Sequence, residues 1–145
     1  MGVMAEIKLQ GILSIWEALR AWKREGWEWE HEGMVRYLPL GDASWSQWYS
    51  APLRSHALMQ LMQTKENIEE PLGLELHWRN SDQGVLLLYQ RGSIASLKIH
   101  KNRKIARIER PLSNATSWDW YVSRLVQPLM DEGILSWYQL EETWF

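Results

Sequence analysis

The sequence predicts a single α+β domain in which an antiparallel sheet packs with about three helices. Two observations carry this prediction. Four consecutive stretches between residues 72 and 110 alternate apolar with polar side chains, and three other segments repeat apolar residues at helical spacing. The 145 residues contain no internal repeat, low-complexity tract or linker, so we expect residues 1–145 to form one domain of ordinary size.

The first two elements are predicted from local patterns. Residues 3–9 alternate apolar with polar side chains, which predicts a half-buried strand. Ser14 and Glu17 have the spacing of a capping box, and Gly26 suits the position just past a helix end. The helix begins at this capping box or nearer Gly11, and its apolar stripe is made of Ile12, Ile15, Trp16, Leu19 and Trp22.

Two prolines help to place the other helices. Pro52 suits the first turn of a second helix over 52–67. A third helix over 115–132 contains Pro128, which lacks a backbone N–H and should kink or split it. A last strand is predicted over 135–140.

The remaining strands are predicted as an N-terminal hairpin and a meander. In the hairpin, over 27–38, a turn at Glu32-Gly33 would pair 31 with 34, 29 with 36 and 27 with 38, and would lay Arg36 over Trp29. Short loops join the four later strands, which favours an antiparallel meander. These strands are predicted over 72–79, 85–91, 93–100 and 104–110.

The composition excludes several kinds of site and indicates an adhesive one. The chain has no cysteine, which rules out disulfides, thiolate catalysis and iron–sulfur clusters. Its net charge of −2 gives no global attraction to nucleic acid. It has 11 tryptophans and one phenylalanine. Most of these indoles should build the core, and we expect two or three to be exposed toward a partner.

No catalytic or cofactor motif is present, so we expect a non-enzymatic protein without metal or cofactor. A serine elbow and a glycine-rich phosphate loop are both missing. No two of the four histidines, His31, His56, His77 and His100, have metal-ligand spacing, so they are predicted to be surface or half-buried side chains. Their convergence in space, and an enzyme of unrecognised type, stay open.

A basic hairpin is the strongest local signal of a binding surface. A turn at Lys101-Asn102 would pair 99 with 104 and 97 with 106. Its outer face would then meet phosphates or an acidic protein surface, or would be a charged edge that discourages aggregation. The candidate contacts are Lys98, His100, Lys101, Arg103, Lys104 and Arg107.

A protein-interaction module, or a small subunit of a larger assembly, is the function these features favour. The predicted contacts are the basic hairpin and three aromatic residues before Pro52, namely Trp45, Trp48 and Tyr49. Small toxin-neutralising immunity proteins have the same profile. The chain shows neither a signal peptide nor an apolar run that spans a bilayer, so we expect a cytoplasmic protein that does not enter a membrane.

One pair of strands resembles a known family. The stretch 74–79, Leu-Glu-Leu-His-Trp-Arg, followed by 84–88, Gly-Val-Leu-Leu-Leu, is similar to a strand pair in small accessory subunits of type III CRISPR effector complexes. The resemblance covers less than a fifth of the chain, includes no diagnostic motif and transfers no functional residue. It implies an alternative function, that of a non-catalytic accessory subunit on a ribonucleoprotein. In that alternative the basic residues in 98–107, identified from their charge, would bind RNA or DNA backbone.

Overall fold

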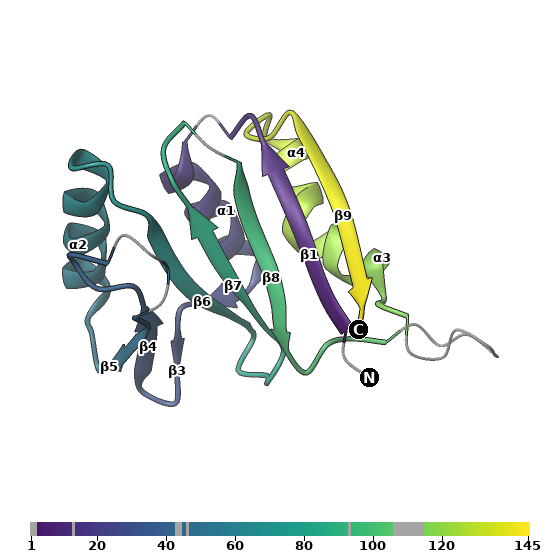
Figure 1. Cartoon of the computed structure of the whole chain (residues 1–145), viewed down its shortest axis with the longest axis horizontal. Helices are drawn as coiled ribbons and strands as arrows, with labels where there is room; N and C mark the ends of the chain where they lie inside the picture. The colour runs from purple at the N-terminus through teal and green to yellow at the C-terminus, as the bar shows by residue number, and fades with distance from the viewer. Residues whose placement is uncertain (1–2, 13, 43–44, 46, 93, 106–114) are drawn as a thin grey trace.

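A single antiparallel sheet organises the structure, which is a computed structural model that describes residues 3–12, 14–42, 45, 47–92, 94–105 and 115–145 (Figure 1). Within these residues the strands lie in the order β3-β4-β6-β7-β8-β1-β9, and β2 also pairs with β6 and β5 with β4. The α+β class is confirmed, with more strands than predicted. They are β1 (Val3–Gln10), β2 (Trp27–Glu28), β3 (Glu30–His31), β4 (Met34–Tyr37), β5 (Tyr49–Ala51), β6 (Leu72–Trp78), β7 (Gly84–Tyr89), β8 (Ala95–Lys101) and β9 (Trp137–Trp144).

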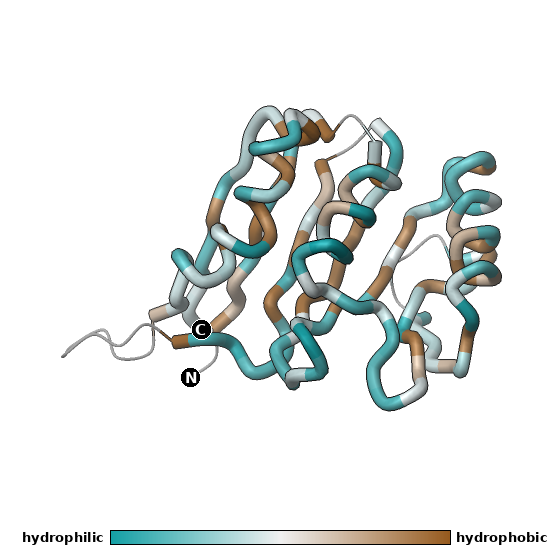
Figure 2. Tube along the Cα trace, turned by 180° about the vertical axis from the view of Figure 1, so that it is seen from behind, coloured by the Kyte–Doolittle hydropathy of each residue, from teal (hydrophilic) through white to brown (hydrophobic). Residues whose placement is uncertain are grey.

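The helices leave one face of the sheet open. Figures 1 and 2 show α1 and the α3–α4 region side by side on one face, with α2 standing apart toward the β3–β5 end. No helix among the described residues has the length and apolar composition needed to cross a bilayer. The helical elements are α1 (Ile15–Glu25), α2 (Ser55–Asn67) and a continuous stretch of α3 (Trp118–Tyr121), the π-helical segment η1 (Val122–Val126) and α4 (Gln127–Asp131).

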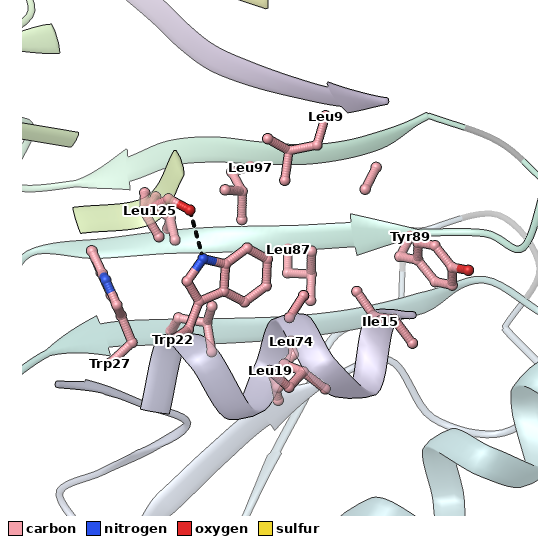
Figure 3. Close-up of a cluster of buried hydrophobic side chains, with 14 of the residues drawn as sticks. Leu9, Ile15, Leu19, Trp22, Trp27, Leu74, Leu87, Tyr89, Leu97 and Leu125 are labelled. Carbon is pink, nitrogen blue, oxygen red and sulfur yellow. Dashed lines mark hydrogen bonds between the residues drawn. The ribbon is translucent and has the colours of Figure 1, made fainter. Parts of the chain in front are cut away.

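The core lies between α1 and the middle strands. The predicted first strand is confirmed, because Ala5, Ile7 and Leu9 of β1 are at most 1% exposed. In register with them, alternate residues of β8, β7 and β6 point to the same side. Figure 3 shows Trp22 of α1 packed against leucines of these strands.

Both ends of α1 follow the predicted signals. The Ser14 side chain caps the start by accepting a hydrogen bond from the Glu17 backbone N–H, at 3.4 Å. Gly26 ends the helix at a φ of +124°, a conformation that L side chains rarely adopt. Gly26 also closely approaches the side chain of Arg79, so the turn from α1 into β2 depends on the absence of a Cβ there.

The third helix is interrupted next to Pro128, as the sequence predicted. The π-helical segment η1 lies directly before the α4 turn that contains Pro128. In an α-helix the N–H of residue 128 would bond the carbonyl of Arg124, which proline cannot do. The indole of Trp27 donates to the Arg124 carbonyl at 3.0 Å, and that of Trp22 donates to the Leu125 carbonyl at 2.8 Å.

The predicted basic hairpin is wrong. Strand β8 lies inside the sheet, with Ile99 paired to Val85 on one side and to Ala5 on the other, so it cannot pair with residue 104. Ile105 instead forms an isolated bridge with Thr116. Residues 106–110 of the predicted fourth strand, including Arg107, lie outside the described residues. Strand β1, which is distant in sequence, pairs with β8 on the side where the prediction had placed the next strand along the chain.

The hairpin over 27–38 is only partly confirmed. His31 pairs with Met34 as predicted. A bend at Trp29 separates β2 from β3, and Trp27 pairs with Trp78 of β6 instead of with Leu38. Because of this split, Arg36 lies over the ring of Trp48, at 5.6 Å, and not over Trp29.

Gly73 in β6 leaves the space that two larger side chains fill on the open face. A Cβ at this position would lie 2.5 Å from Leu38 Cγ and 2.8 Å from Trp48 Cη2. We therefore expect Gly73→Ala to lower the free energy of unfolding by about 2 kcal/mol through overpacking, measured by urea unfolding. Gly84→Ala is the matched control in β7, because its nearest neighbour would be Lys101 Cβ at 3.3 Å. Equal effects of the two substitutions would contradict this account.

Candidate functional site

A groove between α1 and α2 is the most apolar hollow described on the surface. It has a volume of about 540 Å³. Two indoles cross its ends to reach α2: Trp16 Nε1 donates to Glu66 Oε1, and Trp29 Nε1 donates to Ser55 Oγ, each at 3.2 Å. The groove is lined by Trp16, Leu19, Arg20, Lys23, Arg24, Trp29, Met59 and Gln63.

Helical spacing places these side chains along the groove. On α1, Trp16, Arg20 and Lys23 follow the i, i+4, i+7 spacing of one flank, next to the stripe that packs on the sheet. On α2, Leu58 and Met62 are buried, whereas Met59 and Gln63 turn toward the groove. Each helix therefore offers one flank to the groove while its main apolar stripe stays in the core.

The α1 rim of the groove is basic. Arg20 and Lys23 are exposed, and Lys23 Nζ lies 4.5 Å from the centroid of the Trp29 ring. Arg24 forms an ion pair with Glu132. None of the described residues that line the groove is acidic, although Glu66 receives the Trp16 N–H at one end. The groove thus combines apolar walls with a positive edge.

A second, polar hollow lies on the open face of the sheet at the β4 end. It has a volume of about 460 Å³. Pairing of β4 with β5 places Ser50 opposite Arg36, on the side that faces this hollow. The polar hollow is lined by His31, Glu32, Met34, Arg36, Trp48, Ser50, Glu75 and Lys101.

Glu75 holds the polar hollow together. It is 6% exposed, and its two carboxylate oxygens lie 2.6 Å from His77 Nε2 and 2.6 Å from His100 Nε2. Arg36 adds a contact at 3.4 Å. Burial on its own would raise the pKa of Glu75, but the hydrogen bonds from His100 and His77 outweigh it and hold this pKa well below its ordinary value. Glu75 is therefore a buried carboxylate that stays ionised.

Two of the four histidines, His77 and His100, contact this carboxylate, and His31 stacks on His77, an arrangement that their sequence spacing did not predict. The rings of His31 and His77 stack in parallel, with centroids 4.0 Å apart. His77 is 1% exposed, so the expected surface or half-buried position is wrong for it, and its Nδ1 has no described partner. The described residues contain no group of three side chains that could hold a metal ion. The cluster fixes the orientation of two imidazoles and links β6 to β8.

Only part of the predicted basic set lies together, on the open face of the sheet. Lys98 lies between Leu86 and Glu6 in a cross-strand row on the open face, and His100 and Lys101 reach the polar hollow. Arg103 donates to Thr116 and lies 3.7 Å from Glu142.

Lys104 is placed differently again, with its Nζ 5.6 Å from the Trp120 ring. Arg107 falls outside the described residues.

The predicted aromatic contacts differ in exposure and surroundings. Trp48 is half-buried over Gly73 and lines the polar hollow together with Lys101. Tyr49 is 53% exposed and packs edge-on against Tyr37. Trp45 is half-buried. Their role in partner binding stays a prediction.

The tryptophans with the largest exposure are two others, at positions 137 and 144, with 46% and 44% exposed. The groove between α1 and α2 was missed because two of its wall residues, Trp16 and Leu19, were assigned to the apolar stripe of the first helix. The sequence signal that could have found it is the basic flank of the first helix, beside the apolar stripe.

Compared with known proteins, the chain matches no protein-family model, no curated protein and no solved structure.

Proposed function

We propose that this chain is a non-enzymatic protein-interaction module that binds an acidic, amphipathic segment of a partner protein in the groove between α1 and α2. The observation that carries the proposal is the combination, in one hollow of about 540 Å³, of apolar walls and a basic rim. Grooves between helices commonly receive the apolar face of an amphipathic helix, read through anchors spaced by three or four residues.

Charge supports the choice of an acidic occupant. An apolar anchor would fill the space beside Trp16, Leu19 and Met59, while carboxylates on its flank would meet Arg20 and Lys23. Opposite charges at the rim steer association and fix orientation more than they add affinity. A toxin bound by an immunity protein is one kind of partner that can present such a segment.

A double charge reversal on the rim tests this function. The probe is a synthetic amphipathic helical peptide with leucines on one face and glutamates on its flanks, titrated into the isotope-labelled protein and followed by NMR. We expect shifts at the groove and binding that is at least about tenfold weaker for Arg20→Glu/Lys23→Glu. Arg91→Glu/Lys98→Glu changes the net charge equally at other sites and should bind as the wild type does.

Two further arms sharpen the test. The same peptide with lysine in place of glutamate should bind poorly. In purifications from the source cell, a partner retained by the wild type and by the control should be lost from Arg20→Glu/Lys23→Glu. Shifts that map outside the groove, or equal binding by all variants, would contradict the proposed function.

The alternative, a nucleic-acid-associated accessory subunit, is favoured by one observation on the open face. Lys101 and Arg36 flank the half-buried indole of Trp48, and cations beside an aromatic ring suit single-stranded nucleic acid. Its support is narrower because Arg103 and Lys104 face other contacts. A single-stranded RNA that binds with a steep salt slope, lost in Arg36→Glu/Lys101→Glu, would favour this alternative.

A further inference from the structure

The two edges of the sheet differ in their protection. At one edge β2, β3 and β5 are only two or three residues long, which leaves little unpaired backbone. At the other edge β9 runs for eight residues in unbroken register with β1, and it pairs with no other described strand (Figure 1). Short strands, prolines, bulges and charged side chains, lysine above all, normally protect edges. Of these, β9 has only the charges of Glu141 and Glu142.

Aromatic side chains stand at both ends of this open edge. Trp137 is 46% exposed at one end, and Trp144 and Phe145 are 44% and 72% exposed at the other. Tyr138 follows Trp137, so the segment 137–145 begins and ends with an aromatic pair. A segment with this arrangement is self-complementary when it runs antiparallel to a copy of itself, as a twofold interface requires.

We propose that β9 pairs antiparallel with β9 of a second copy of this chain, with the twofold axis at Glu141, so that the two sheets join into one. Residues directly opposite each other in an antiparallel pair point to the same face, which restricts the register to steps of two residues. Centring on Glu141 is the register that matches all four aromatic residues. Trp137 then lies opposite Phe145 of the second copy, Tyr138 opposite Trp144, Gln139 opposite Thr143, and Leu140 opposite Glu142.

The neighbouring registers match the aromatic residues less well. With the axis at Leu140, Trp137 would face Thr143 and Tyr138 would face Glu142. With the axis at Glu142, Trp137 and Tyr138 would have no partner. Cross-strand aromatic pairs stabilise a sheet by up to about 1 kcal/mol each, so the register centred on Glu141 is favoured.

The charge at the axis has a counter-ion in each copy. Two Glu141 side chains would stand opposite each other, and like charges so placed are destabilising. Lys8 of β1 lies 2.8 Å from Glu141 on the same face of the sheet. Glu6 lies directly opposite Glu141 on this face, and Lys98 lies opposite Glu6. Each copy would therefore bring two carboxylates and two ammonium groups to this part of the sheet, which would have no net charge.

Single cysteines test the register, because the natural chain has none. Opposed residues in an antiparallel pair have Cα atoms about 5 Å apart, within disulfide range. We expect Glu141→Cys to form a disulfide-linked dimer on mild oxidation, read by non-reducing electrophoresis and mass spectrometry. Gln139→Cys should not, because the two copies of residue 139 are offset by four residues, about 13 Å along the strands. Cross-linking of both variants alike would overturn the register.

A charge swap tests the pairing itself by light scattering and sedimentation across a concentration series. Trp137→Glu alone, and Trp137→Glu with Phe145→Glu, should weaken self-association at least about tenfold. Trp137→Glu with Phe145→Lys should restore it, because each new carboxylate then faces an ammonium group of the second copy. Ile68→Lys, at a residue that is 56% exposed away from β9, is the control and should dimerise normally.

A monomeric wild type at all concentrations, or a swap that restores nothing, would overturn the proposal. The result is independent of the proposed function, because Arg20→Glu/Lys23→Glu should leave the dimer intact.

Discussion

Replacing Trp22 with phenylalanine is expected to lower the free energy of unfolding by about 3 kcal/mol. Trp22 is 1% exposed, and its indole nitrogen donates to the carbonyl of Leu125 at 2.8 Å (Figure 3). Phenylalanine removes the donor and leaves both an unmade buried hydrogen bond and a cavity. Urea unfolding followed by far-UV circular dichroism measures the loss.

The effect should be specific to this buried bond. Trp16→Phe is the matched control on the same helix, because Trp16 is only half-buried and its indole donates to Glu66 at the surface of α2. We expect that change to cost less than about 1 kcal/mol. If both substitutions destabilised the protein equally, the buried hydrogen bond between α1 and η1 would contribute no more stability than the surface hydrogen bond of Trp16.

The elements that the sequence predicted well are those whose signals lie within the element. The Ser14 cap and Gly26 end of α1, the alternation of β1 and the break before Pro128 each depend on neighbours in the chain. Such signals act through local backbone geometry and through the face that a residue presents, so they can be read without knowing what packs against them.

Strand pairing could not be read in this way. Strand β8 alternates apolar and polar residues whichever strand lies beside it, and the alternation does not distinguish the segment after residue 104 from β1, some ninety residues away. Strands consecutive in sequence are often neighbours, and that tendency was the basis of the wrong hairpin. Residues predicted to share its outer face therefore separated, as His100 and Arg103 did.

The candidate sites were predicted least well because they depend on register. The alternation in β6 did place Glu75 and His77 on one face, two residues apart. The position of His100 beside them follows only from the pairing of β6 with β7 and of β7 with β8. The groove between α1 and α2 depends on how far apart two helices stand, which neither helix encodes alone.

Replacing Glu75 with leucine is expected to destabilise the protein by about 3 kcal/mol at neutral pH. Leucine has a similar volume but cannot accept the N–H groups of His77 and His100. The cost of the lost hydrogen bond should be largest at His77, because its Nδ1 already lacks a described partner and the ring is 1% exposed. Chemical denaturation gives the size of the loss. Glu75→Gln keeps one acceptor and should fall between the wild type and Glu75→Leu.

The same substitution should change how stability depends on pH. The pKa of Glu75 is held below its ordinary value of 4.5 by the two histidine hydrogen bonds, against the effect of burial. A lowered carboxyl pKa stabilises the folded state above the unfolded-state pKa, and that contribution is lost as the pH falls toward the folded-state value. The wild type should therefore lose stability below about pH 5 more steeply than Glu75→Leu.

An exposed carboxylate on the opposite face of the sheet, where it pairs with Val35, separates this network from a general effect of charge. Glu30 in β3 is exposed, so Glu30→Leu should change the stability by less than about 0.5 kcal/mol. The loss of stability below about pH 5 should then be as steep as in the wild type. If Glu75→Leu were as stable as the wild type, the two histidines would have found other partners. The contact between β6 and β8 would then not depend on this network.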